Sequence, residues 1–557
     1  MTTAQHSDVL IMGGGLAGLS LAIQLRRELP AASVRVLERN RHPVPEAAFK
    51  VGESTVEIGA HYFDSVLGLK QHLDECQIRK FGFRFFFNDG REEVDSVTEL
   101  GVSRVFATPA YQLDRGIFEN HLAKHAAELG ADFLDGAVVR SIDVAEDGSD
   151  HAVRYSREGA EHVATARWLI DASGRAGLLK RKLDLAEENG HDANAIWFRI
   201  AERIAIDDWS DDAPWRSRCN PAERWRSTNH LCGPGYWAWL IPLASGSHSI
   251  GIVADATLHP LETINSFDKA MAWFAQHQPR LHRELDMRRD KLQDFAFLRH
   301  FSHGCKQVFS AQRWALTGDA GLFLDPFYSP GSDFIAISNT YITELVHRQL
   351  DGHGIRIATK LFETVYQTLF STGLSIYQGQ YPLFGNAKVM PAKVMWDICY
   401  YWSLAGPLYF AGKLTSIPTL VTVRRTLDKA VALNTTMQAF FRSWDTVEPG
   451  EVRTGFIDPS KIDTAWELIT HLSDQPPNGV ANLLRDNLGL MHEIAAEIVG
   501  VAQTDHPELT RPKPVRAWDG TVAHFGHVYD TVGVGVGMDD KDTSAHLTRS
   551  SAPAERS

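Results

Sequence analysis

A glycine-rich turn near the N-terminus has the residues needed to bind a phosphate group. The apolar segment 8–12 predicts a strand, and Gly13-Gly14-Gly15-Leu16-Ala17-Gly18 follows it and opens a helical pattern. Glycines in such a turn let the backbone approach a pyrophosphate, and the helix N-terminus supplies amide donors and a positive dipole. Glu38 stands 20 residues after Gly18, after a second predicted strand over 34–37, where an acid meets ribose hydroxyls. The pattern predicts a dinucleotide site, whose contacts we assign to Gly13, Gly15, Leu16, Ala17, Gly18, Glu38 and Arg39.

A lysine inside an aromatic segment is the strongest candidate for catalysis. Residues 78–87 read Ile-Arg-Lys-Phe-Gly-Phe-Arg-Phe-Phe-Phe and predict one strand, on which Lys80 shares a face with Gly82, Arg84 and Phe86. Burial among aromatic side chains shifts the proton equilibrium of a lysine, which suits it to chemistry near neutral pH. The alternative is an edge-strand lysine whose ammonium lies in solvent.

Two tryptophans lie in a W-x-W-x-I-P segment that runs from Trp237 to Pro242. The strand period places Trp237 and Trp239 on one face and Ala238 on the other. Two indole rings on one face can wall off a space beside a planar cofactor. The alternative is an ordinary strand whose aromatic side chains pack in the core.

Four further segments follow in a recognisable order: 50–54, 112–118, 171–175 and 318–320. Together with the glycine turn, this order resembles the flavoprotein monooxygenase superfamily, and the W-x-W-x-I-P segment is similar to that of the flavin-dependent halogenases. The helical C-terminal extension resembles the phenol and pyrrole branch of that family. The resemblance covers roughly residues 8–340. It implies FAD as the cofactor and adds to its contacts Ser54, Arg115, Asp319 and Gly331.

The resemblance also implies a reaction. Reduced FAD arrives from a separate flavin reductase, O2 and chloride or bromide are co-substrates, and an electron-rich phenol or pyrrole is halogenated in secondary metabolism such as antibiotic biosynthesis. Lys80 takes the place of the catalytic lysine, while Trp237, Trp239 and Pro242 form the wall of the flavin pocket. The aromatic substrate is free or tethered to a carrier protein.

The loop over 325–334 matches the place where the halogenases hold their halide on backbone amides. Ser329, Gly331 and Ser332 are the candidate halide residues, but Pro330 falls where one donor is expected and has no N–H. Tyr328 stands where the tryptophan halogenases carry a glutamate, which favours a phenol or pyrrole over free tryptophan.

Three other functions fit the same motifs. A flavin-dependent monooxygenase or oxidative decarboxylase would share the fold and lack the halide site. A reductase similar to the geranylgeranyl reductases would use Tyr236 to Pro242 as a Y-x-W-x-x-P element. The third is a flavin-binding partner without catalytic activity.

The order of predicted elements indicates an α/β fold: a Rossmann-like FAD-binding domain of the flavoprotein monooxygenase type, an inserted antiparallel substrate sheet and a mostly helical C-terminal domain. Helical spacing over 114–129 and alternation over 195–204 and 248–253 support this order. The expected domains are 1–185 (FAD-binding, first part), 186–300 (substrate sheet), 301–340 (FAD-binding, return segment), 341–537 (helical) and 538–557 (disordered tail).

Composition narrows the class of protein. The net charge of −13 over 557 residues argues against broad nucleic-acid binding. Five scattered cysteines and no paired metal-ligand motif predict neither a disulfide framework nor a metal site, and they favour the cytoplasm. The longest uncharged stretch, 398–412, is 15 residues with a proline inside, so we expect a helix pair and no membrane span.

Overall fold

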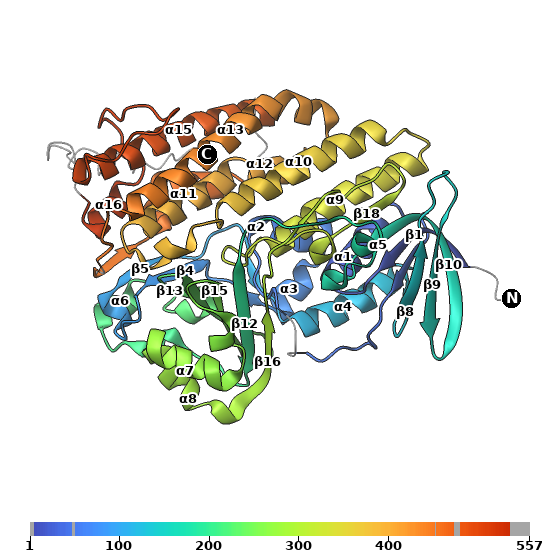
Figure 1. Cartoon of the computed structure of the whole chain (residues 1–557), viewed down its shortest axis with the longest axis horizontal. Helices are drawn as coiled ribbons and strands as arrows, with labels where there is room; N and C mark the ends of the chain where they lie inside the picture. The colour runs from blue at the N-terminus through green and yellow to red at the C-terminus, as the bar shows by residue number, and fades with distance from the viewer. Residues whose placement is uncertain (1–4, 47–50, 452, 473–478, 535–557) are drawn as a thin grey trace, which may run out of the picture.

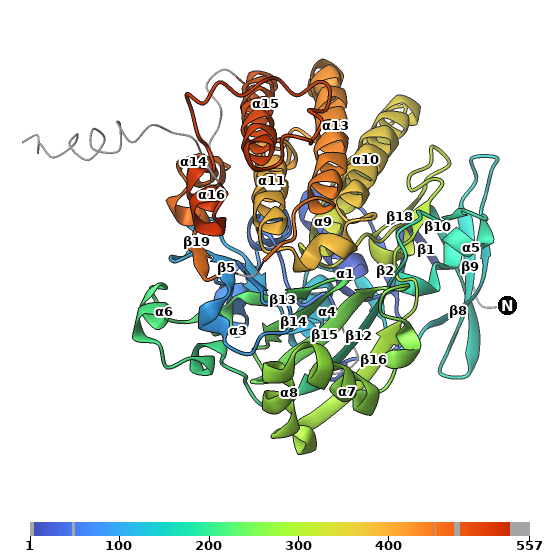
Figure 2. The same cartoon turned by 60° about the vertical axis from the view of Figure 1, so that its left-hand side comes forward.

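A computed structural model describes residues 5–46, 51–451, 453–472 and 479–534. Figures 1 and 2 show two sheets side by side and a layer of long helices over them. The predicted α/β architecture with a mostly helical C-terminal region is confirmed. The predicted disordered tail at 538–557 lies outside the described residues.

The first sheet is the Rossmann-like one. Its parallel strands are, in spatial order, β7 (Asp132–Leu134), β2 (Val34–Leu37), β1 (Gln5–Met12), β10 (Ala160–Asp171) and β18 (Trp314–Leu316). The long strand β10 pairs with β18 near its C-terminal end and with β9 (His151–Arg157) near its start, and β8 (Val138–Asp143) completes this antiparallel edge. Helices α1 (Leu16–Glu28) and α4 (Arg115–Glu128) pack against each other beside the sheet.

The second sheet has eight strands and draws on three separate parts of the chain. In spatial order they are β16 (Leu292–Leu298), β12 (Ala193–Ile200), β15 (His248–Asp255), β14 (Tyr236–Pro242), β13 (Thr228–Gly233), β4 (Phe83–Phe87), β5 (Thr98–Gly101) and β19 (Gly455–Ile457). Five of these lie inside the expected range 186–300, while β4 and β5 come from before it and β19 from the helical region. Two short strands, β11 (Ala186–Glu187) and β17 (Gly304–Cys305), pair separately.

Alternate residues of β14 face two different hydrophobic cores. Trp237 and Trp239 belong to the main core, and Ala238 belongs to a second core under α7 (Phe267–His277) and α8 (Pro279–Asp286). The prediction that the two indoles share one face is therefore confirmed.

The prediction of one continuous strand over 78–87 is wrong. The segment is divided into β3 (Ile78–Arg79), which pairs with β6 (Tyr111–Gln112), and β4 in the large sheet. Gly82 has φ +67, in the left-handed region that favours glycine, and there the chain passes from one sheet to the other. Lys80 thus lies in the break and does not share a strand face with Arg84.

The C-terminal region is a layer of helices that covers the sheets on one side, as Figures 1 and 2 both show. It contains α9 (Gly331–Leu350), α10 (Arg356–Ser375), α11 (Val389–Ser403), α12 (Ala405–Phe410), α13 (Ile417–Asp445), α14 (Asp463–Thr470), α15 (Val480–Asp505) and α16 (Gly526–Val532). Shorter helices elsewhere are α2 (Glu57–His61), α3 (Lys70–Cys76), α5 (Leu178–Lys182) and α6 (Ala213–Ser217). The expected helix pair over 398–412 corresponds to the end of α11 and to α12. Within the described ranges, every helix is too short or too polar to cross a bilayer.

A buried charge cluster stabilises the edge where β4 meets β5. Glu99 on β5 is fully buried and binds two arginines: Arg84 from β4, and Arg224, whose Nε lies 2.8 Å from Glu99 Oε1. Each guanidinium also donates to a backbone carbonyl, Arg84 to Val102 and Arg224 to Trp215, both at 2.6 Å. Because all three side chains are excluded from water, the carboxylate is needed to balance the two cations.

We predict that Glu99→Gln destabilises the fold by about 3–5 kcal/mol, because the amide keeps the shape and removes the charge that two buried guanidinium groups require. Urea unfolding measures this as a lower midpoint of the first transition. Glu262→Gln is the control, since Glu262 pairs with Arg299 in an exposed ion pair and its loss should leave the midpoint unchanged. Equal midpoints for E99Q and wild type would contradict the role of the cluster.

Candidate active site

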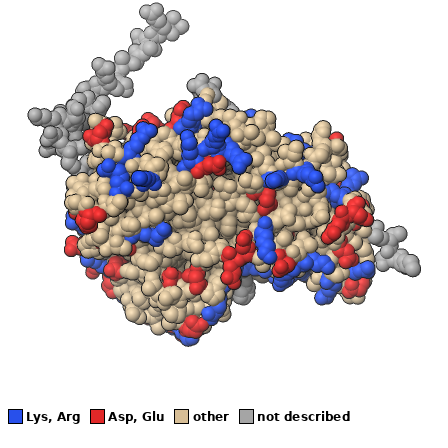
Figure 3. All heavy atoms as spheres, turned by 45° about the horizontal axis from the view of Figure 1, so that its top comes forward, with Lys and Arg blue, Asp and Glu red and all other residues tan. Residues whose placement is uncertain are grey.

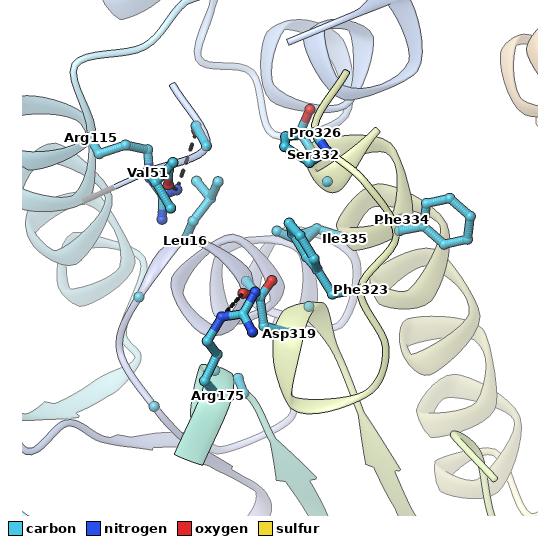
Figure 4. A pocket seen from close by; sticks show the side chains of 18 of the residues that line it. Leu16, Val51, Arg115, Arg175, Asp319, Phe323, Pro326, Ser332, Phe334 and Ile335 are labelled. Atoms are coloured by element: carbon cyan, nitrogen blue, oxygen red, sulfur yellow. Dashed lines mark hydrogen bonds and ion pairs between the residues drawn. The ribbon is translucent and has the colours of Figure 1, made fainter. Parts of the chain in front are cut away.

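The first of two large cavities lies where the glycine turn, α4 and the start of α9 meet. It has a volume of about 540 Å³ and is seen from close by in Figure 4. The predicted cofactor residues that line it are Gly13, Gly15, Leu16, Ala17, Glu38, Arg39, Ser54, Arg115, Asp319 and Gly331. The structure thus brings together residues from 13 to 331, and of the predicted set only Gly18 is absent from the lining.

Three of the four glycines of the turn are required for two different geometric reasons. A Cβ on Gly13, which has φ +116, would lie 2.2 Å from the Ala172 carbonyl oxygen, and one on Gly18 would lie 2.0 Å from the Gly13 oxygen. These two positions therefore let backbone segments pack closely. A Cβ on Gly15 would meet no protein atom within 4 Å, so this face of the turn is open toward the cavity. An open glycine face at the N-terminus of α1 fits the pyrophosphate of FAD.

Polar side chains around this cavity are held by defined partners. Glu38 accepts hydrogen bonds from the Gly14 N–H at 2.6 Å and the Asn40 N–H at 2.7 Å. Arg115 Nη1 donates to the Val51 carbonyl at 2.6 Å, and Arg175 Nε lies 3.7 Å from Asp319 Oδ2; Figure 4 shows both contacts. The cavity therefore has an acid at one end, as the ribose position requires, and cations with fixed orientations along its length.

The three candidate halide residues near the start of α9 differ in whether their backbone N–H groups already have an acceptor. The N–H of Ser329, a residue with φ +53, already donates to the Pro326 carbonyl at 2.9 Å, and Pro330 has no N–H. The N–H groups of Gly331 and Ser332 begin α9 and have no acceptor among the described residues. The Ser332 hydroxyl is buried, also without a partner in the described ranges. Gly331 and Ser332, not Ser329, thus have free donors at this wall of the cavity.

The tryptophan pair lines the same cavity. The ring centroids of Trp237 and Trp239 are 5.7 Å apart. Trp237 Nε1 donates to the Tyr381 hydroxyl at 3.1 Å, and Trp239 Nε1 to the Ser249 hydroxyl at 3.2 Å, so both rings have fixed orientations. Pro242 ends β14 and lines neither large cavity.

A second, larger cavity of about 810 Å³ lies between the second sheet and the helical layer. Leu324, Pro330 and Phe334 line both cavities and form the partition between them. In Figure 4 the Phe334 ring points away from the other labelled side chains of the first cavity. The loop before α9 and the first turn of α9, rather than the tryptophan pair, therefore separate the two spaces.

Lys80 lies at the junction of the two cavities. Its side chain is buried and lines the second cavity, while its Nζ donates to Ser54 Oγ, on the wall of the first, at 2.9 Å. It also donates to the Thr55 carbonyl at 3.0 Å and lies 3.6 Å from the centroid of the Phe83 ring. This burial excludes the alternative of a surface lysine with its ammonium in solvent.

Two buried carboxyl groups near Lys80 were not identified from the sequence. Asp333 accepts hydrogen bonds at 2.8 Å from the Tyr401 hydroxyl and from the Gly59 N–H, and both Asp333 and Glu57 line the second cavity. Burial raises the pKa of Asp333 to about 8 and also raises that of Glu57. Burial lowers the pKa of Lys80 to about 7, against the effect of these two carboxylates. The only sequence signal was their placement beside predicted site segments, Glu57 after Ser54 and Asp333 after Ser332.

Tyr328 belongs to a different buried network. Its hydroxyl donates to Asp397 Oδ2 at 3.0 Å, and Asp397 also binds Lys393 at 2.5 Å and Gln438 at 2.7 Å. Burial raises the pKa of the Tyr328 phenol well above its usual range, so the group stays protonated at neutral pH. It therefore does not replace the carboxylate base that the tryptophan halogenases carry at this place. Among the described residues, no group of His, Cys, Asp and Glu side chains is placed to hold a metal ion.

Known proteins are similar to this chain in sequence and in fold. A family model described as "FAD binding domain" matches residues 6–235. Flavin-dependent halogenase chlA of Dictyostelium discoideum is 29% identical over 438 residues, which cover 72% of this chain and 71% of that protein. The 1H-pyrrole-2-carbonyl-[peptidyl-carrier protein] chlorinase of Pseudomonas fluorescens is 26% identical over 347 residues, 58% of this chain and 72% of that protein.

Solved structures give the same fold. The crystal structure of halogenase PltM in complex with phloroglucinol and FAD superposes with a TM-score of 0.62 at 16% identity, over 91% of this chain and 97% of that chain. The flavin-dependent brominase Bmp2 superposes with a TM-score of 0.53 at 23% identity, over 79% and 98%. With the FAD-type cavity, the buried lysine and the W-x-W-x-I-P strand in place, residues 6–235 match the FAD-binding domain and the chain is similar to flavin-dependent halogenases.

Proposed function

We propose that this enzyme uses reduced FAD, O2 and chloride or bromide to halogenate an electron-rich aromatic ring of the phenol or pyrrole type. The observation that carries the proposal is the position of Lys80, which is bonded to a wall residue of the first cavity and faces the second. Oxidation of halide in one space and transfer to the ring in the other require a group at their junction.

The first cavity is proposed as the FAD site. The α1 N-terminus and the open face of Gly15 would hold the pyrophosphate, Glu38 the adenosine ribose, and Asp319 the ribityl chain, with Trp237 and Trp239 as a wall. When bound, reduced FAD activates O2 so that halide is oxidised to hypohalous acid. We propose that a separate flavin reductase supplies it, as the resemblance to the halogenases implies.

Halide would be held at the start of α9. The free N–H groups of Gly331 and Ser332 and the Ser332 hydroxyl converge on the partition, and the positive end of a 20-residue helix favours an anion there. This arrangement replaces the donor that is lost at Pro330. Ser329, the third residue assigned to this role from sequence, has its N–H engaged elsewhere.

Lys80 would then direct the halogen to the substrate. Its ammonium has three protons, two of which are donated to Ser54 and Thr55, so one remains for the oxygen of hypohalous acid. As the ring carbon forms its bond to halogen, the oxygen–halogen bond breaks and the departing oxygen takes a proton from the ammonium to become water. The Lys80 amine, left neutral by that transfer, would take up the proton that the ring carbon releases, which restores the ammonium.

The substrate would lie in the second cavity. Its inner end combines Phe83, Tyr328 and Tyr401, which form an aromatic surface for a planar ring beside Lys80. One relative is named for action on a pyrrole carried by a peptidyl-carrier protein, and a related structure holds phloroglucinol. Both support a phenol or pyrrole ring, free or carrier-bound, as the substrate class.

The open face of Gly15 leads to a binding prediction. Gly15→Ala should fold normally, because the added methyl meets no protein atom and the backbone is extended there, yet it should weaken FAD binding at least tenfold because the methyl occupies the phosphate space. Titration of the apo protein with FAD, followed by flavin fluorescence, measures the affinity. Gly354→Ala, where a methyl also meets nothing, is the control. Unchanged FAD affinity in G15A would place the pyrophosphate elsewhere.

Removal of Lys80 should abolish halogen transfer and keep cofactor binding. With reduced FAD, O2 and bromide, Lys80→Ala should form brominated phenol at least about 100-fold more slowly than wild type, the usual size of a proton-transfer contribution. Mass spectrometry of the product gives the rate, and Lys70→Ala, an exposed lysine on α3, should match wild type. Halogenation by K80A at the native rate, or a halide-independent gain of oxygen in the wild-type product, would refute the proposal and favour a monooxygenase.

The protonation of Lys80 should appear in the pH profile. Because its pKa is lowered to about 7, the ammonium is present below that pH and is lost above it, so kcat/KM should fall as pH rises through about 7. Asp333→Asn should move this decline to lower pH, since the neighbouring carboxylate favours the ammonium form. Asp351→Asn, at the exposed end of α9, removes the same charge and should leave the profile unchanged. A decline at the same pH in D333N and wild type would show that the two groups are not coupled.

A further inference from the structure

The second cavity extends far beyond the ring-sized space at Lys80. It follows one side of α10, a helix of 20 residues, which at 1.5 Å per residue is about 30 Å long. The lining positions recur every four residues along this helix, at Arg356, Lys360, Thr364, Thr368 and Thr372, and the series continues at Ile376 just after it. A cavity of this length is longer than any single phenol or pyrrole requires.

The inner end of this cavity is the catalytic end. Tyr377, just after α10, has its ring centroid 6.1 Å from that of Tyr328, and Tyr328 is 6.1 Å from Phe83, which contacts the Lys80 ammonium. The first residues of α10 therefore lie at the opposite, outer end. A ligand with its ring beside Lys80 would extend along α10 toward Arg356.

The middle of the cavity is apolar. Leu361, Val365 and Leu369 line it from α10, and Leu420, Leu427 and Val431 from α13. The threonine hydroxyls on the same side of α10 donate to their own helix, Thr364 to the Lys360 carbonyl at 2.8 Å and Thr368 to the Thr364 carbonyl at 2.7 Å. The wall thus offers methyl and methylene groups, which suit a hydrocarbon chain better than a chain of amides.

The outer end combines exposed apolar and basic side chains. Ile357 on α10 is 75% exposed and Val421 on α13 is 63% exposed, although both line the cavity. Arg356 and Lys360 lie at this end of α10, and Arg424 follows Val421 by one turn of α13. None of the three has a carboxylate within ion-pair distance in the part of the chain that the structure describes; Asp428 also lines the cavity. Figure 3 shows Lys and Arg side chains across the face formed by the helical layer. In a chain of net charge −13, these unpaired cations favour an anionic group.

We propose that the second cavity binds an elongated amphipathic substrate: an electron-rich ring at Lys80, a long hydrocarbon chain along α10, and an anionic end group at Arg356, Lys360 and Arg424. This inference rests on the proposed function for the role of the ring end. The exposed Ile357 and Val421 would be covered by the part of the chain nearest the anionic group.

Direct binding to the oxidised holoenzyme tests this assignment without turnover. Isothermal titration would compare an ω-(hydroxyphenyl)hexadecanoate, its methyl ester and ethylphenol. We expect the acid to bind at least tenfold more tightly than the ester, and the ester more tightly than ethylphenol, because chain and charge contribute separately. Equal affinities for the acid and ethylphenol would overturn the proposal.

Variants locate the two contributions. The triple variant Arg356→Ala, Lys360→Ala and Arg424→Ala should remove the advantage of the acid over the ester, whereas Arg425→Ala with Lys429→Ala, two exposed cations of α13 that do not line the cavity, should keep it. Leu427→Trp should weaken both long ligands at least tenfold and leave ethylphenol unchanged. An acid-to-ester ratio that is the same in the triple variant and wild type would also overturn the proposal.

A competition experiment distinguishes two sources of the anionic group. A hydroxybenzoyl thioester on an acyl-carrier protein, whose pantetheine arm has a phosphate at a similar distance from the ring, would be added as a competitor. Failure to displace the acid supports the hydrocarbon-chain assignment, and displacement at equal affinity overturns it in favour of a carrier arm. Tight binding of the acid without any brominated product would refute the proposed function and leave this inference intact.

Discussion

The site depends on one buried ammonium group. Among the described residues, Lys80 donates to two acceptors, Ser54 Oγ and the Thr55 carbonyl, and they hold it where the first and second cavities meet. Charge burial is costly, so the surrounding fold must compensate it with Glu57, Asp333 and the Phe83 ring. These three residues come from different parts of the chain. The second sheet and α9 must therefore be assembled before Lys80 can be buried in this position.

The residues between the two cavities are held in place by α9. Pro330 immediately precedes α9 and Phe334 lies in its first turn, so the groups facing each cavity are fixed relative to the helix axis. The loss of a donor at Pro330 moves the available amides by one residue toward α9, where the helix itself favours an anion. Although Pro330 has no N–H, the start of α9 thus has two backbone donors without an acceptor among the described residues.

Site features that depend on residues close together in the sequence could be predicted. The glycine turn, Glu38 and the tryptophan alternation depend on neighbours within one strand–turn–helix unit or one strand, and the structure agrees with them. The prediction of one strand through Lys80 is wrong because the chain pairs with β6 before Gly82 and with β13 after it. This change of partner is a tertiary effect. Asp333 and Glu57 could not be predicted for the same reason. Residues 57, 80 and 333 come together only in the folded chain, and no sequence spacing typical of a helix, strand or turn links them.

The pairing of β19 with β5 has a consequence for the synthesis of the chain. The β5 edge of the large sheet is covered by residues 455–457, more than three hundred residues after β5 itself. At ribosomal rates of about 5–20 residues per second, this edge remains without its final strand for roughly twenty seconds to a minute. An unpaired edge invites pairing with other chains, so the nascent protein passes through an aggregation-prone interval that a chaperone would shorten or protect.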